Sequence, residues 1–163
     1  MYLGWALLMT VIIILSIILL AIDQISKILV VKLIDINRPI EVIKNFFYLT
    51  YTHNTGAAFS ILTGQRLFLI LIAVIILIIL INYIRKNTVR EKIDIISFSL
   101  IIGGSLGNLI DRIVRGYVVD FLDFKIFGYN FPVFNLADTF IVIGVILLLI
   151  TTLTRKEVKH DNR

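Results

Sequence analysis

The chain has 163 residues, of which 59% are hydrophobic and 17% are charged, and it carries a net charge of +5. Soluble domains contain about 45–50% apolar and about 25% charged residues, so this composition excludes a disordered chain, a coiled coil and an ordinary water-soluble globule. The absence of cysteine excludes disulfides, thiolate zinc sites and cysteine nucleophiles, and two histidines make a histidine-rich metal centre unexpected. A protein dissolved mainly in lipid is indicated.

Four segments are long and apolar enough to cross a membrane as helices, which requires about 20 residues. They are, in chain order, residues 3–22, 67–84, 93–110 and 137–153. No Lys or Arg precedes the first segment, and Asp23 and Gln24 follow it, so we expect a permanent helix and not a cleaved signal peptide. The third segment is the least apolar of the four, with several Gly residues in its second half.

Basic residues predict the orientation of these helices. The connection between the second and third segments contains Arg85, Lys86, Arg90 and Lys92, and the tail contains Arg155, Lys156, Lys159 and Arg163. Loops rich in Lys and Arg remain in the cytoplasm. We therefore expect both termini and the 85–92 connection to be cytoplasmic.

The two outward connections, about residues 23–66 and 111–136, contain more than linker sequence. Residues 41–43 and 46–52 are rich in β-branched and aromatic side chains, as strands are. Residues 118–134 alternate short apolar runs with a Gly-Tyr-Asn turn, which indicates a hairpin. Since aromatic side chains favour the membrane–water boundary, we expect both connections to lie at the outer interface. The fold class we predict is an integral membrane, mainly α protein. It has four transmembrane helices, a small extracytoplasmic β platform and one domain over residues 1–163.

Unusual polar residues gather at the outer ends of the helices and in the outer connections. Burying an unpaired charge in a membrane protein costs several kcal/mol, so a cluster of this kind requires pairing or use. The residues are Asp23, Lys27, Asn54, Asn108, Asp111, Arg112, Asp120, Asn135 and Asp138.

Several of these residues also have purely structural explanations. Asp23 and Lys27 are four positions apart and can form an ion pair that anchors the first helix, and Asp111 can pair with Arg115 in the same way. Arg112 can extend its side chain to the membrane surface. The small residues at positions 103 and 107 allow a second helix to approach closely.

Asp120 and Asp138 each stand as a single acid in an apolar run on the outer side. In one interpretation, Asp138 merely caps the N-terminus of the fourth helix or interacts with the positive end of its dipole. Alternatively, two carboxyl groups a few Å apart do not both ionise readily, so one keeps its proton. Such a pair can hold a water, activate it as a base and protonate a leaving amine, which is aspartic protease chemistry. Asp123, in a more polar stretch, is expected to be structural.

Two other function classes use intramembrane acids. A membrane assembly subunit or small transporter would bind ions or protons, but would need polar residues along more than one helix, reaching both faces. A lipid-modifying enzyme would hold a metal–phosphate group with a carboxylate cluster such as two close DxxD motifs. Only residues 120–123 have that form.

Five segments together resemble lipoprotein signal peptidase, also called signal peptidase II, of bacteria. They occur in the order and spacing of that family and extend over nearly the whole chain. The segments are Asp23–Lys27, Asn54–Ser60, Gly107–Arg112, Val119–Phe121 and Phe134–Asp138.

The resemblance implies a bacterial plasma-membrane aspartic endopeptidase with its active site toward the extracytoplasmic face. It would cut diacylglyceryl-modified prolipoproteins just before the lipidated cysteine. It also implies that Asp120 and Asp138 are the catalytic pair. Expected partners are these prolipoproteins and membrane lipid, with no cofactor, metal, nucleic acid or obligate protein partner. The resemblance also implies a polar shell that positions the substrate, formed by Asn54, Gly56, Asn108, Arg112 and Asn135. It further implies structural support from Asp23, Lys27 and Asp111.

Overall fold

The computed structural model describes residues 2–57, 61–86 and 91–161, and the side chains of residues 5–57, 61–86 and 91–154. Part of the basic 85–92 connection and the basic side chains of the C-terminal tail therefore lie outside the described residues. The same applies to residues 58–60 of the second motif.

Four helices form a bundle and are each long and apolar enough to cross a membrane. Their bounds are α1 Tyr2–Leu33, α2 Arg66–Lys86, α3 Lys92–Val114 and α4 Leu136–Asp161. α3 packs against both α1 and α4 and is the most buried of the four, while α2 contacts mainly α3. The least apolar of the four predicted spans is therefore the central helix.

α1 is longer than the sequence predicts, because it continues through Asp23 to Leu33 where a connection was expected. The first two charged side chains there, Asp23 and Lys27, are fully buried and paired with each other. Charges that neutralise one another one turn apart do not interrupt a helix. Farther on, the buried side chain of Val30 packs against the sheet, which stabilises the last turns of α1.

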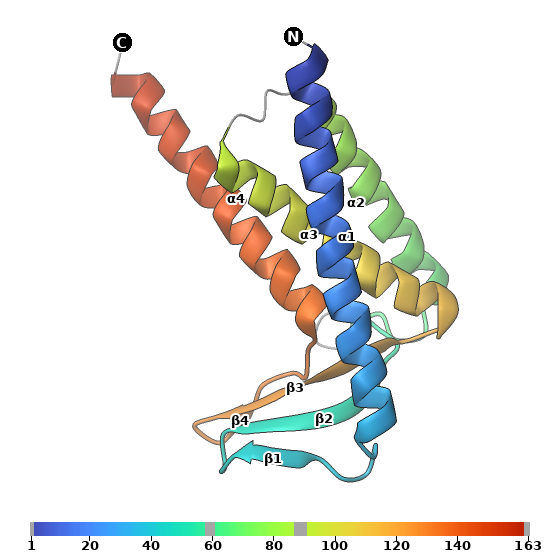
Figure 1. Ribbon diagram of the computed structural model, residues 1–163. Coiled ribbons are helices and arrows are strands. Elements are labelled where there is room, and N and C mark those ends of the chain that lie inside the picture. Colours follow the sequence, from blue (N-terminus) through green and yellow to red (C-terminus); the bar gives the residue numbers. More distant parts are fainter. Residues whose placement is uncertain (1, 58–60, 87–90, 162–163) are drawn as a thin grey trace.

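The four strands form one antiparallel sheet in the order β1-β2-β3-β4. Their bounds are β1 Ile40–Ile43, β2 Phe47–Asn54, β3 Val118–Ile126 and β4 Tyr129–Asn130. The predicted strands and the predicted hairpin are therefore confirmed. The sheet lies at one end of the helix bundle, and the Tyr2 end of α1 and the Asp161 end of α4 lie at the other (Figure 1). The chain thus has the architecture of a four-span membrane protein with a small sheet.

Small residues bring α3 into close contact with its neighbours. A Cβ atom at Gly103 would lie 2.9 Å from the backbone oxygen of Ser16 in α1, and one at Gly107 would collide with the carboxyl group of Asp23. The close approach that the sequence predicted at these two positions is confirmed. It places the polar end of α3 directly against the polar end of α1.

Candidate active site

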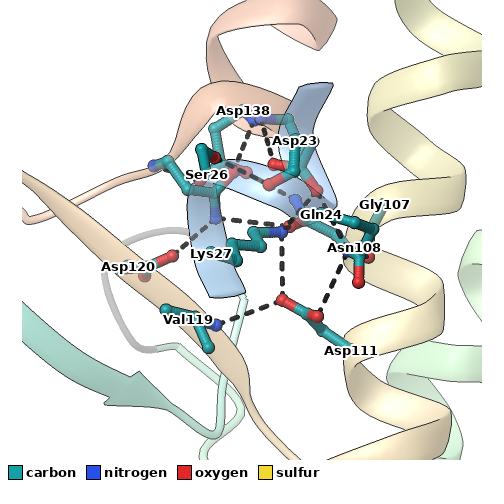
Figure 2. A network of polar contacts seen from close by, with 12 residues as sticks. Asp23, Gln24, Ser26, Lys27, Gly107, Asn108, Asp111, Val119, Asp120 and Asp138 are labelled. Carbon is teal, nitrogen blue, oxygen red and sulfur yellow. Dashed lines mark hydrogen bonds and ion pairs between the residues drawn. The ribbon is translucent and has the colours of Figure 1, made fainter. Parts of the chain in front are cut away.

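A buried ion cluster joins α1 to α3. The ammonium of Lys27 lies 2.9 Å from a carboxyl oxygen of Asp23 and 3.0 Å from one of Asp111, and all three side chains are fully buried (Figure 2). Arg115, one turn after Asp111, contacts the other oxygen of Asp111. Both predicted pairs are therefore confirmed. The two carboxylates and two cations satisfy each other, as buried charges require.

Asn108 connects this ion cluster to Asp138. Its side-chain oxygen accepts a hydrogen bond of 3.0 Å from Lys27, and its side-chain amide donates one of 2.7 Å to Oδ1 of Asp138. The same oxygen accepts a second hydrogen bond, of 3.2 Å, from the amide of Asn135. One buried amide therefore contacts α1, α4 and the segment before α4.

Asp120 lies on β3 with its carboxyl group held by two side-chain amides. Asn54, at the end of the adjacent strand β2, donates to Oδ2 at 2.8 Å, and Asn135 donates to Oδ1 at 2.6 Å. Asp120 is almost fully buried. Burial, followed by the negative charge of Asp138, raises the pKa of Asp120 to about 6. Asp120 therefore holds its proton more tightly than an exposed acid does.

Asp138 is in the first turn of α4 and forms a reciprocal cap with Asn135. The backbone N–H of Asp138 donates to the side-chain oxygen of Asn135 at 2.9 Å, and the backbone N–H of Asn135 donates to Oδ2 of Asp138 at 3.3 Å. The capping interpretation of Asp138 is thus confirmed. It coexists with a second role, because Oδ1 remains directed at Asn108 and the carboxyl group lines a cavity.

Arg112 and Gly56 close one side of this arrangement. Arg112 is partly buried and donates to the backbone oxygen of Gly56 at 2.9 Å, in addition to a contact with the backbone of Asn108. The backbone N–H of Gly56 donates to the side-chain oxygen of Asn54 at 2.9 Å. The guanidinium therefore binds the loop that follows β2 and is not simply extended toward water.

A cavity of about 480 Å³ lies between these polar residues and an apolar wall. Asp120 and Asp138 both line it, together with Asn54, Asn108 and Arg112. The lining also includes residues 131–134, before α4, and residues 139 and 141–143 of α4. Two coupled carboxyl groups that share one cavity can hold and activate a water.

Asp123 does not belong to this cavity. It is three positions after Asp120 on β3, so the alternation of side chains along a strand directs it to the other face. There its carboxyl group accepts a hydrogen bond of 2.9 Å from Thr50 on β2. The DxxD pattern of residues 120–123 therefore does not bring its two acids together. Among the described residues, no three His, Cys, Asp or Glu side chains form a group that could hold a metal ion.

Two contributors to the site were not singled out in the sequence. Gln24 donates to the backbone oxygen of Gly107 at 3.2 Å and to Asp111 at 3.3 Å, and so joins α1 to α3. Its position inside the Asp23–Lys27 motif was the available signal. Arg66, at the start of α2, donates to the backbone oxygens of Arg112 and Ile113 at 2.7 Å and terminates α3. No local pattern pointed to that contact.

Comparison with known proteins gives a consistent result over most of the chain. Residues 15–154 match a sequence model described as signal peptidase (SPase) II. A lipoprotein signal peptidase of Haemophilus ducreyi is 43% identical over 151 residues, which cover 90% of this chain and 93% of that protein.

Two solved structures, both described as bacterial membrane enzymes, share the fold. One has a TM-score of 0.84 and 39% identity and covers 91% of this chain and 90% of its own. The other has a TM-score of 0.78 and 40% identity and covers 87% of this chain and 92% of its own. The matched residues 15–154 include both Asp120 on β3 and Asp138 on α4. This chain therefore belongs to the signal peptidase II family.

Proposed function

We propose that this chain is an aspartic endopeptidase that removes signal peptides from diacylglyceryl-modified prolipoproteins. Cleavage occurs just before the lipidated cysteine, at the outer face of the bacterial plasma membrane. The observation that carries this proposal is that Asp120 and Asp138 line the same cavity and that asparagine amides bind each of them. Membership of the signal peptidase II family supports the substrate class.

The chemistry needs one ionised and one protonated carboxyl group in the pair. The ionised group takes a proton from a water, whose oxygen attacks the carbonyl carbon of the peptide bond, while the protonated group gives its proton to the carbonyl oxygen. The resulting tetrahedral intermediate then collapses: one of its hydroxyl groups returns a proton to the ionised carboxyl group, the carbon–nitrogen bond breaks, and the nitrogen of the cysteine accepts a proton from the protonated carboxyl group, so the pair again holds one proton. The electrostatic coupling between Asp120 and Asp138 supports this sharing of one proton.

The cavity suits a substrate that arrives from lipid. Val142 and Ile143 of α4 line the cavity and are also exposed on the outside of the bundle, at 56% and 44%. The cavity therefore opens beside a surface that lipid covers. The acyl chains of the substrate stay in the bilayer while the peptide bond reaches the carboxyl pair.

The sheet end of the bundle faces the extracytoplasmic side, and both termini face the cytoplasm. The separation of the sheet from the two chain ends in Figure 1 supports this orientation, as do the basic residues Arg85, Lys86 and Lys92 at the facing ends of α2 and α3. The active site then lies where water can be replaced from outside.

The test is to incubate the purified protein with a lipidated prolipoprotein and with the same protein lacking lipid. We expect cleavage of the lipidated form alone, with a new N-terminus at the cysteine. Equal cleavage of both forms would contradict the assigned specificity. The absence of cleavage by a folded protein would contradict the reaction itself.

A further inference from the structure

Three asparagine amides aim their nitrogen atoms at the acid pair. Asn54 and Asn135 donate to Asp120, and Asn108 donates to Asp138. The oxygen and nitrogen of a side-chain amide occupy nearly the same volume, so an amide rotated by half a turn fits equally well. A rotated amide would present an oxygen to the acid in place of a donor. Each asparagine therefore needs a second contact that fixes its orientation.

For two of the three, the backbone supplies that contact. The oxygen of Asn54 accepts a hydrogen bond of 2.9 Å from the N–H of Gly56, and the oxygen of Asn135 accepts one of 2.9 Å from the N–H of Asp138. A backbone N–H only donates, so rotation of either amide would place two donors against each other. These two orientations are fixed by the local chain.

Asn108 lies within α3 and is fixed differently. Its oxygen accepts hydrogen bonds from the ammonium of Lys27 at 3.0 Å and from the amide of Asn135 at 3.2 Å. Rotation would place the amide nitrogen of Asn108 against both donors. Asp138 does not fix this amide by itself. When its carboxyl group is protonated, its O–H can donate to the oxygen of a rotated Asn108 amide as readily as its oxygen accepts from the nitrogen of the unrotated one.

We propose that Lys27 is a positioning residue for the acid pair, whose ammonium, together with the amide of Asn135, holds the oxygen of Asn108 so that the Asn108 amide donates to Asp138 in every protonation state of the pair. This inference rests on the proposed function of Asp120 and Asp138. It assigns Lys27 a role in catalysis in addition to the structural support that the family resemblance implies. Asp23 and Asp111 hold Lys27 in place from α1 and α3.

The charge of Lys27 has a second, measurable consequence. The charged groups that face it are Asp23 on α1 and Asp111 on α3. The acid pair lies beyond Asn108 on β3 and α4, where Arg112 of α3 is a second positive charge that faces both acids. Its positive charge lowers the pKa of Asp120 against the opposing effects of burial and of Asp138. Removal of Lys27 therefore allows the pair to retain its proton to a higher pH.

Lys27 cannot be removed alone without leaving Asp23 unpaired, so the experiment uses Asp23→Asn as its background. Asn retains the oxygen that accepts the N–H of Ala137, and Asp111 keeps Arg115. In this background, Lys27→Met removes the donor and the charge, while Lys27→Gln removes the charge and keeps a neutral donor on a side chain that is one bond shorter. The kcat, KM and pH profile of each variant are measured on a lipidated prolipoprotein, with thermal unfolding measured in parallel.

Relative to Asp23→Asn, we expect kcat of the Met variant to fall by about 10- to 100-fold with little change in KM. This loss corresponds to one misdirected hydrogen bond to a charged group. The Gln variant recovers part of that loss, and the pH profiles of both variants shift to higher pH. A purely structural role would lower the unfolding temperature without moving the pH profile. A folded Met variant with the kcat and pH profile of the Asp23→Asn background would overturn the inference.

If the Met variant does not fold, Asn108→Asp decides the question in the otherwise natural chain. It keeps an oxygen for Lys27 and presents a second oxygen to Asp138, as a rotated amide would. A loss of about 10-fold or more in kcat with unchanged unfolding supports the inference, and natural kcat overturns it. Cleavage by the natural chain separates the two proposals, because its absence contradicts the peptidase function, whereas a failed variant test contradicts only the role of Lys27.

Discussion

The two ends of the helix bundle satisfy their buried polar groups in different ways. At the end away from the sheet, beside an apolar cluster that includes Phe98, the hydroxyls of Ser97 and Ser99 donate at 2.7 Å to backbone oxygens four residues earlier in their own helix, and Ser99 has a longer second contact, of 3.4 Å, with the backbone oxygen of Ile12. At the sheet end, Lys27 and Asn108 bind side chains that belong to other elements. Hydrogen bonds within one helix need only that helix, whereas hydrogen bonds and ion pairs between elements require the complete fold. The active site is built from the second kind.

The largest effect is expected from removing one acid of the pair. Asp120→Asn or Asp138→Asn should lower kcat by about 10³-fold, because the variant lacks either the base or the acid of the reaction. The measurement is cleavage of a lipidated prolipoprotein, with thermal unfolding as the control for folding. Full activity in a folded variant would exclude the assigned pair.

The opposite end should respond in stability and not in chemistry. Phe98 is 1% exposed and packs with Ile12 and Ile84, so Phe98→Ala should lower the free energy of unfolding by about 3 kcal/mol. Phe127→Ala, at a fully exposed position on the hairpin tip, is the matched control and should change stability little. Unfolding in detergent measures both. A loss of kcat in folded Phe98→Ala protein would show that the two ends are not independent.

A smaller effect concerns pH. The pKa of Asp120 is raised from 3.8 to about 6, by burial first and by Asp138 second. The folded protein thus binds this proton more tightly than the unfolded chain, and the stability that the proton contributes is lost as the pH rises from about 3.8 to about 6. Above this range Asp120 has lost this proton and can no longer act as the acid of the pair. The value of kcat/KM should therefore fall by up to about tenfold per pH unit, and a profile that stays flat above pH 6 would contradict this assignment.

The smallest effect is expected at Asp123, on the face of β3 away from the cavity. Asp123→Ala removes a hydrogen bond from Thr50 and should lower the free energy of unfolding by about 1 kcal/mol. Cleavage should be unchanged in both kcat and pH dependence. A change in the pH profile would place Asp123 in the electrostatic environment of the pair after all.

Much of the secondary structure of this protein, and some of its side-chain pairing, can be predicted from local sequence. Apolar runs of membrane-spanning length predicted the four helices, and the spacing of Asp23 with Lys27 and of Asp111 with Arg115 predicted two ion pairs, because residues four apart share a helix face. The end of α1 was not predicted, since the polarity of Asp23 resembles a membrane boundary until its partners are known. The cap that Asp138 forms with Asn135 follows from helix geometry alone.

Only the tertiary structure decided how the asparagines are used. Asn54, Asn108 and Asn135 come from three distant segments, and nothing in their local sequence states that all three amides meet at the acid pair. The local chain fixes the amides of Asn54 and Asn135, whereas the amide of Asn108 is oriented by groups from other elements. The contacts of Gln24 and Arg66 with the C-terminal half of α3 likewise depend on the tertiary structure. Periodicity and charge spacing report interactions within one element, whereas the direction of a hydrogen bond depends on which groups the fold brings to its two ends.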